Sequence, residues 1–81
     1  MARILMIDDD QKLGNLVTTY LKQHGHQVHQ VTTANEGRSV AKRGAHDAIL
    51  LDIMLPDGNG LDVCRDLVAS SSTPILSLIH I

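Results

Sequence analysis

The stretch ILMIDDD, residues 4–10, joins an apolar run directly to three consecutive acidic residues. An uninterrupted apolar run of this kind, here from Arg3 to Ile7, is typical of a β-strand covered on both faces. A second stretch, DAILLD at residues 47–52, has the same form, because its apolar residues end in Asp52. Two buried strands that each end in acid therefore indicate both the kind of sheet and the edge at which a site would form.

The residues around these two strands alternate between helical and extended patterns. Apolar residues after the first acids recur with helical spacing and predict an amphipathic helix; they are Leu13, Leu16, Val17, Tyr20 and Leu21. Asp9 or Asp10 can cap the start of this helix, and Gly25 can close its end. Residues 26–32 are more polar and predict an edge strand. A short helix, capped by Asn35, should then run to Gly44.

The C-terminal half continues the same alternation. Residues 55–60, LPDGNG, predict a loop, since Pro, Gly, Asp and Asn all favour turns. A helix with Leu61, Cys64, Leu67 and Val68 on its apolar side follows, and another apolar strand begins at Pro74. The order β-α-β-α-β-α-β predicts an open parallel α/β sheet with right-handed crossovers, arranged as α/β/α in three layers.

Composition limits the class of protein. The chain has 81 residues, of which 43% are hydrophobic and 20% are charged, as expected for one globular domain. Its formal charge of −2 predicts no direct binding to nucleic acid or to an anionic membrane. The single cysteine, Cys64, cannot form an internal disulfide, so we expect a reducing, cytoplasmic setting. The sequence also has no signal-peptide pattern and no apolar stretch long enough to span a membrane.

The acids at the strand ends are the candidate site. In open α/β sheets, ligands bind outside the carboxyl ends of the strands, where the strand order reverses. If the two strong strands are neighbours, Asp8, Asp9 and Asp52 converge there and repel one another, and Mg²⁺ would relieve that repulsion. Helix capping and the helix dipole offer a simpler explanation for Asp9 and Asp10. They do not explain Asp52, which lies between apolar residues.

Three stretches together resemble the receiver domain of two-component response regulators: ILMIDDD, LLDIMLPDGNGLDV and TPIL. Within the second stretch, the segment DIMLPDGNGLDVC is most similar to the corresponding segment of the OmpR-type transcription factors. The resemblance runs from about Ala2 to Leu76 and implies a flavodoxin-like strand order. It also implies a phosphorylation switch rather than an enzyme. Its phosphoryl group would come from a sensor histidine kinase, and its output would be transcription regulation by a DNA-binding domain that lies outside this chain.

The resemblance also implies roles for single residues. Asp52 matches the phosphoacceptor, and Asp8 and Asp9 match the acidic pair that holds Mg²⁺. The backbone carbonyl of Met54 would complete the metal shell. The residues that would shape the pocket beside the acceptor are Pro56 and Gly60. Asp10 matches no metal ligand in the family and is expected to act as a helix cap.

The chain departs from the family pattern near its end. The family has Thr or Ser where Ile79 stands, and Ser77 comes two residues too early. A fifth strand with its Lys does not follow. The last residues, LSLIHI, resemble a translated sequencing adapter, so we interpret residues 1–76 as a partial receiver domain and 77–81 as a non-native tail. The fourth strand would then be an apolar edge, and we expect a marginally stable domain with weak Mg²⁺ affinity.

Other functions remain open at this point. A Mg²⁺-dependent phosphohydrolase fragment also uses strand-end Asp nucleophiles, but such enzymes place a second Asp where Met54 stands. An interaction fold without activity is a further alternative.

Several other residues give weaker signals. His24, His26 and His29 could bind a metal, although no Cys or carboxylate has suitable spacing, so we interpret them as solvated. The residues from Asp57 onward fit neither a calcium loop nor a dinucleotide fingerprint. We expect Cys64 in the core. The sequence predicts no oligomeric state.

Overall fold

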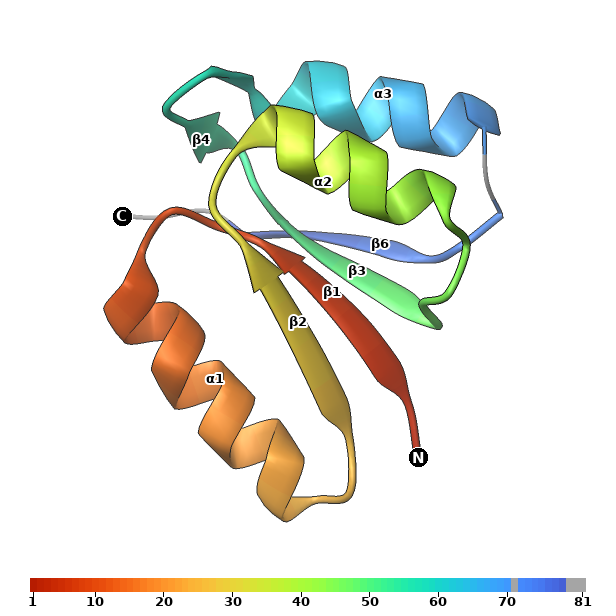
Figure 1. The fold of residues 1–81 in the computed structure, drawn as a ribbon. Helices are drawn as coiled ribbons and strands as arrows, with labels where there is room; N and C mark the ends of the chain where they lie inside the picture. Colours follow the sequence, from red (N-terminus) through yellow and green to blue (C-terminus); the bar gives the residue numbers. More distant parts are fainter. Residues whose placement is uncertain (71, 79–81) are drawn as a thin grey trace.

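The computed structural model describes residues 1–70 and 72–78, and its elements follow the predicted order (Figure 1). The elements are β1 (Arg3–Ile7), α1 (Gln11–Gln23), β2 (Gln27–Val31), α2 (Ala34–Lys42), β3 (Ala48–Asp52), β4 (Met54–Leu55), β5 (Gly58–Asn59), α3 (Gly60–Ser70) and β6 (Ile75–Leu78). One difference is that the stretch expected as a plain loop forms the short antiparallel hairpin β4–β5.

Four parallel strands form the main sheet in the order β2-β1-β3-β6. The two strands that end in acid, β1 and β3, are therefore neighbours, paired from Ile4 with Ala48 to Ile7 with Leu51. The more polar strand β2 lies at one edge, as its composition predicts, and β6 lies at the other. The open parallel α/β sheet is confirmed, and the order of connection reverses between β1 and β3.

Helices α2 and α3 lie side by side over one face of the sheet (Figure 1). A Cβ atom at Gly37 of α2 would overlap the side chain of Ile7, so the helix and β1 approach closely there. Arg38 and Asp66 join the two helices through a 2.9 Å ion pair. The buried core lies mainly beneath these helices and consists of Leu5, Ile7, Val31, Ala34, Ala41, Ile49, Leu51, Leu55, Val63 and Leu67.

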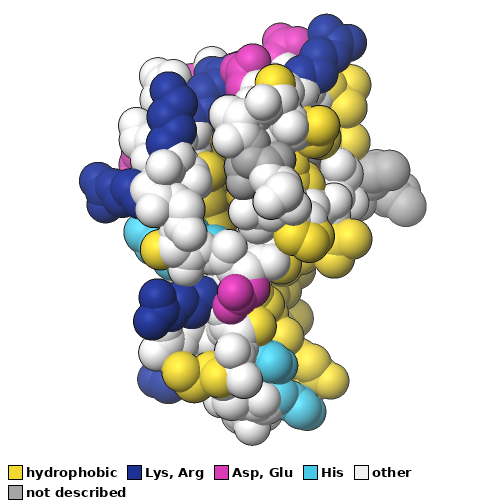
Figure 2. All heavy atoms as spheres, turned by 90° about the vertical axis from the view of Figure 1, so that its right-hand side faces the viewer, with side chains coloured by type: hydrophobic (Ala, Val, Ile, Leu, Met, Phe, Trp, Pro, Cys, Tyr) yellow, Lys and Arg dark blue, Asp and Glu magenta, His cyan; other side chains and the backbone are white. Residues whose placement is uncertain are grey.

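Helix α1 covers the opposite face, mainly over β2. There a Cβ atom at Gly14 would overlap the side chain of Gln30. The apolar stripe predicted to face the core is only partly buried, since Leu16 is 68% exposed and Tyr20 is 59% exposed. Leu76 on β6, beyond the reach of α1, is 62% exposed. Figure 2 shows hydrophobic side chains reaching the surface along one side of the molecule.

The helix ends agree in part with the sequence analysis. Asp10 caps α1, because its Oδ1 accepts a 3.0 Å hydrogen bond from the backbone N–H of Leu13. The expected cap Asn35 is wrong: Thr33 caps α2 and accepts from the N–H of Glu36 at 3.2 Å. Gly25 and Gly44 follow their helices with φ angles of +82° and +67°, which a residue with a Cβ rarely adopts.

Cys64 was expected in the core. Its side chain is half-buried and packs against the core rather than within it.

Two expectations concern the end of the chain. The position of Ile79 lies outside the described residues, as do positions 80 and 81 of the proposed tail.

Within the part of the chain that the structure describes, no helix has both the length and the hydrophobicity needed to cross a bilayer.

Candidate functional site

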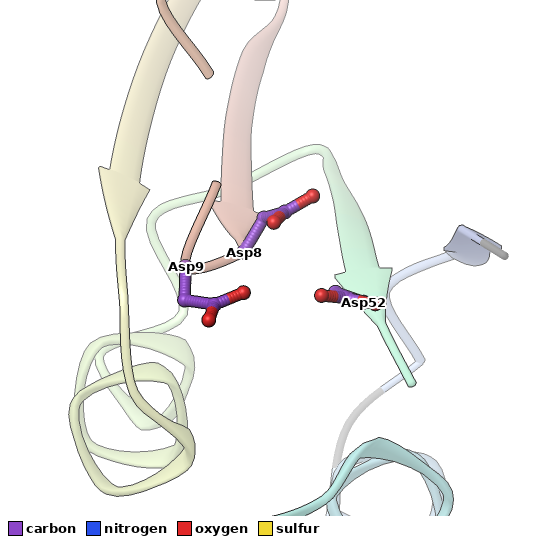
Figure 3. A group of neighbouring side chains, drawn as sticks. All are labelled: Asp8, Asp9 and Asp52. Carbon is purple, nitrogen blue, oxygen red and sulfur yellow. The ribbon is translucent and has the colours of Figure 1, made fainter. Parts of the chain in front are cut away.

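Three carboxylates from two strands meet at the carboxyl edge of the sheet (Figure 3). Asp8 and Asp9 follow β1, and Asp52 ends β3. Because Ile7 pairs with Leu51, Asp8 and Asp52 emerge at the same level of neighbouring strands. One carboxylate oxygen from each of the three aspartates lies within 4.8 Å of the other two. The convergence expected from the sequence is therefore present in the fold.

The acidic group, Asp8, Asp9 and Asp52, combines burial with negative charge. Asp8 is 0% exposed and Asp52 is 2% exposed, whereas Asp9 is open to solvent. Burying a charge is costly unless other groups compensate for it. Oδ1 of Asp8 accepts a 2.8 Å hydrogen bond from the N–H of Asp10, which compensates part of that cost. Three oxygen donors without sulfur or imidazole suit a hard divalent cation, so the residues present fit Mg²⁺.

Gln30 holds the loop that carries the first two acids, a role that the sequence analysis missed. Its side-chain Nε2 donates to the carbonyl oxygen of Asp8 at 3.2 Å and to that of Asp10 at 3.4 Å. The N–H of Asp8 also donates to the carbonyl oxygen of Val31 at 3.0 Å. No local pattern identifies Gln30, because its partners become its neighbours only when β2 pairs with β1.

Met54, Pro56 and Gly60 lie on the segment that leaves Asp52. The backbone of Met54 pairs with Asn59 in the β4–β5 hairpin, and Pro56 stands in the turn between these strands. The N–H of Gly60 donates to the carbonyl oxygen of Ile53 at 2.7 Å, and a Cβ atom at Gly60 would overlap the backbone of Asp52. This close approach requires glycine. The metal-shell role of Met54 and the pocket-shaping roles of Pro56 and Gly60 stay predictions.

Asp57 is a second residue whose role the sequence analysis missed. Its carboxylate accepts hydrogen bonds from the N–H groups of Ala34 at 2.6 Å and Asn35 at 3.1 Å. The hydrogen bond from Ala34, followed by that from Asn35, holds the pKa of Asp57 below its ordinary value. Asp57 thus ties the β4–β5 hairpin to the start of α2. An acid opposite a helix start is a favourable arrangement, but only the tertiary structure brings the two segments together.

Ser77 and the histidines do not join the acidic group. Ser77 pairs with Leu51, and Leu78 pairs with Asp52. Since side chains alternate along a strand, Ser77 lies on the side of Leu51 and not on that of Asp52. Among residues 1–70 and 72–78, the acidic group is the one set of three or more His, Cys, Asp or Glu side chains close enough to share a metal. His24, His26 and His29 form no such set.

Comparison with known families gives one match over most of the chain. Residues 4–79 match the family model described as the response regulator receiver domain. Among curated proteins, the transcriptional regulatory protein RstA of Escherichia coli is 38% identical over 78 residues, which are 96% of this chain and 33% of RstA. The DNA-binding response regulator MtrA of Mycolicibacterium smegmatis is 38% identical over 76 residues, or 94% of this chain and 33% of MtrA. The chain thus spans about a third of the length of these relatives.

Solved receiver domains have the same fold. The non-phosphorylated HemR receiver domain from Leptospira biflexa superposes with a TM-score of 0.91 at 34% identity, over 98% of this chain and 64% of that one. The BeF3-activated receiver domain of RstA from Klebsiella pneumoniae gives a TM-score of 0.92 at 34% identity, over 98% of this chain and 68% of that one.

Proposed function

The chain belongs to the response regulator receiver domain family, and from this membership we propose that Asp52 accepts a phosphoryl group from a sensor histidine kinase. The observation that carries the proposal is the meeting of Asp8, Asp9 and Asp52, within 4.8 Å, from two strands far apart in the chain. Phosphorylation would act as an on/off switch. The names of RstA and MtrA, a transcriptional and a DNA-binding regulator, support transcription control by a separate output domain.

In the proposed transfer, a carboxylate oxygen of Asp52 attacks the phosphorus atom of a phosphohistidine. An O–P bond forms and the N–P bond breaks, and the histidine nitrogen of the kinase keeps the electron pair and takes a proton from solvent. A carboxylate is a weak nucleophile, so the reaction depends mainly on position and on electrostatic stabilisation. Asp52 is only 2% exposed, and the close approach of Gly60 to its backbone restricts the movement of the chain that carries the carboxylate.

The residues that would hold Mg²⁺ are Asp8, Asp9, Asp52 and the backbone carbonyl of Met54. When bound, the ion would supply positive charge that offsets the repulsion between the carboxylates and the incoming phosphoryl oxygens. Asp8 is already held in place by the N–H of Asp10, and Gln30 fixes the backbone on both sides of Asp9. The alternative of a phosphohydrolase has less support, because Met54 stands where its second Asp would be.

The limits and location of the domain belong to the same proposal. We place the receiver part at residues 1–76 and treat 77–81 as a non-native tail. The proposed switch works in the cytoplasm, where the kinase domain and the DNA are accessible. This segment itself contacts no nucleic acid, in keeping with its formal charge of −2.

The deciding experiment is phosphorylation with acetyl phosphate and Mg²⁺, read by intact-protein mass and by loss of the label in hydroxylamine. We expect one labile phosphoryl group on the wild-type chain and on Asp62→Asn, a matched control on the exposed surface of α3. Asp52→Asn should take up none, and Asp9→Ala should lose Mg²⁺ affinity and phosphorylation together. Labelling of Asp52→Asn at the wild-type rate would refute the assignment. A folded wild-type chain that takes up no label would favour the inactive interaction fold.

A further inference from the structure

One side chain from the edge strand β2 supports the loop between β1 and α1. Nε2 of Gln30 donates to the carbonyl oxygen of Asp8 at 3.2 Å and to that of Asp10 at 3.4 Å. Both partners are carbonyl oxygens, so only the NH₂ end of the amide, which has two N–H donors, can face them. The two contacts enclose the backbone of Asp9, the exposed metal-ligand candidate of the acidic group. Gln30 therefore acts on the loop rather than on a carboxylate.

The loop needs such support because the carboxylates of the acidic group repel one another. Asp8 and Asp52 are buried where neighbouring strands end, whereas Asp9 lies outside both β1 and α1. Figure 3 shows the Asp9 side chain pointing from the loop toward Asp52. With the three carboxylates within 4.8 Å, movement of the loop at Asp9 is the easiest way to relieve the repulsion. Hydrogen bonds to the backbone on either side of Asp9 oppose this movement, and the neutral amide adds no charge.

Gly14 of α1 leaves the space that the Gln30 side chain occupies. A Cβ atom at Gly14 would overlap Nε2, Oε1 and Cδ of Gln30. Glycine inside a helix is less favourable than alanine, so its presence there needs a reason. The N–H of Gly14 also donates to the carbonyl oxygen of Asp10 at 2.9 Å, so α1 and Gln30 meet at one atom. The room that Gln30 needs to reach the loop accounts for the glycine.

We propose that Gln30 is a positioning residue that raises the affinity of the acidic group for Mg²⁺, and that Gly14 is required for this role. The inference deepens the magnesium-binding role proposed above and rests on it. A loop that is already held in the binding geometry loses less conformational freedom when the ion binds, which strengthens binding without a new contact to the ion. Residues that orient metal ligands commonly change metal affinity by about 10–100-fold. Because both Gln30 contacts are long for hydrogen bonds, we expect the lower limit.

The first test removes the two donors of Gln30. Gln30→Met keeps the length of the side chain and its lack of charge. Mg²⁺ titration of the ¹⁵N-labelled 81-residue chain, read from the amide signals of Asp9 and Asp10, should give an affinity about tenfold weaker than that of wild type. Gln27→Met is the matched control, because Gln27 lies at the other end of the same strand, paired with Arg3, and should leave Mg²⁺ binding unchanged.

Amide hydrogen exchange in EDTA separates positioning from simple packing of β2 against α1. The N–H of Asp10 donates to Oδ1 of Asp8 at 2.8 Å and reports opening of the loop. The N–H of Ile49 donates to the carbonyl oxygen of Pro74 at 2.9 Å and reports opening of the sheet. In Gln30→Met, exchange at Asp10 should become several-fold faster, while exchange at Ile49 should stay as in wild type. A purely structural role would speed both by the same factor.

The second test fills the space at Gly14. The Cβ atom of Gly14→Ala would meet the flexible end of Gln30, which can turn aside, so the chain should fold but the amide should leave the loop. We expect Gly14→Ala and Gln30→Ala to lose Mg²⁺ affinity to a similar extent. The double variant should lose no more than either single one, because both changes remove the same contacts. If Gln30→Met unfolds, Gly14→Ala replaces it in the titration and in the exchange experiment.

The outcomes distinguish this inference from the function on which it rests. Equal Mg²⁺ affinity in wild type and Gln30→Met, or equal acceleration of exchange at Asp10 and Ile49, would overturn the role of Gln30 and leave the magnesium site intact. Additive losses in the double variant would overturn the role of Gly14. Signals of Asp9 and Asp10 that do not respond to Mg²⁺ in the wild-type chain would instead refute the magnesium site itself, and this inference with it.

Discussion

The two faces of the sheet differ in how well their apolar residues are covered. On the side of α2 and α3, Leu5, Ile7 and Leu51 are 0% exposed. On the side of α1, the apolar side chains of the sheet become more exposed as their distance from the helix increases. Met6 in β1 is fully buried, whereas Leu76 on the edge strand β6 is 62% exposed. The reason is geometric, because two helices lie side by side on the first face and a single helix lies mainly over β2 on the second (Figure 1).

This difference separates the candidate site from the weakest part of the fold. The acidic group extends from β1 and β3, the two strands that are best anchored to the α2–α3 face. Its geometry therefore depends on the covered face. The α1 face and the edge strand β6 should instead govern solubility and association, because exposed apolar surface and an unpaired strand edge favour contact with other chains.

The largest expected effect compares one leucine from each face. Leu51→Ala removes a fully buried side chain beneath α2 and α3 and should lower the free energy of unfolding by about 2–5 kcal/mol. Leu16→Ala, at a side chain that is 68% exposed, should change it by less than about 0.5 kcal/mol. Urea unfolding followed by far-ultraviolet circular dichroism measures both. Equal losses would show that the α1 face is packed as tightly as the other.

The next effect concerns the backbone behind Asp52. Gly60→Ala would force a Cβ atom into the Asp52 carbonyl oxygen and should cost about 1–3 kcal/mol, the usual range for overpacking. Gly58→Ala is the control, since its Cβ would meet only the Ala34 side chain at 3.7 Å. Unfolding curves of the two variants give the comparison. A larger loss for Gly58→Ala would contradict the close approach at Gly60.

A smaller, pH-dependent effect is expected at Asp57. Because its pKa is lower in the folded chain than in the unfolded one, its hydrogen bonds to α2 stabilise the fold above the ordinary pKa of an aspartate. This stabilisation is lost as the pH falls through the folded value. Asp57→Asn should therefore be less stable than wild type near neutral pH, and the difference should vanish in acid. Urea midpoints across this pH range test the sign, with Asp62→Asn, at an exposed aspartate of α3, as the control.

The smallest change in stability is expected at the exposed edge. Leu76→Lys should alter the free energy of unfolding by less than about 0.5 kcal/mol, because the side chain is already exposed. It should nevertheless reduce self-association, since residues 72–78 carry no charge and a lysine on an edge strand opposes pairing with other chains. Sedimentation velocity over a range of concentrations measures this. Unchanged association would place the contact elsewhere.

The sequence analysis succeeded where local pattern is enough. The apolar runs before Asp8 and Asp52 predicted both strands, and the polar composition of β2 predicted its place at an edge. One error was local: Thr33 rather than Asn35 caps α2, because the backbone is still extended at Thr33 with φ −130° and ψ 157°. Another error arose where segments distant in the chain decide the outcome, since the exposure of Leu16 depends on what else covers its side of the sheet.

The sequence by itself determined the alternation of strands and helices, the acids at two strand ends and, through its motifs, the receiver family. These features reside in the spacing of apolar residues and in short motifs, which are local properties of the chain. Only the tertiary structure decided that the two strands with acidic ends are neighbours, that Gln30 holds the loop after β1, and that Asp57 ties the β4–β5 hairpin to α2. Such contacts depend on strand register and helix packing, and these bring together residues that no local pattern relates.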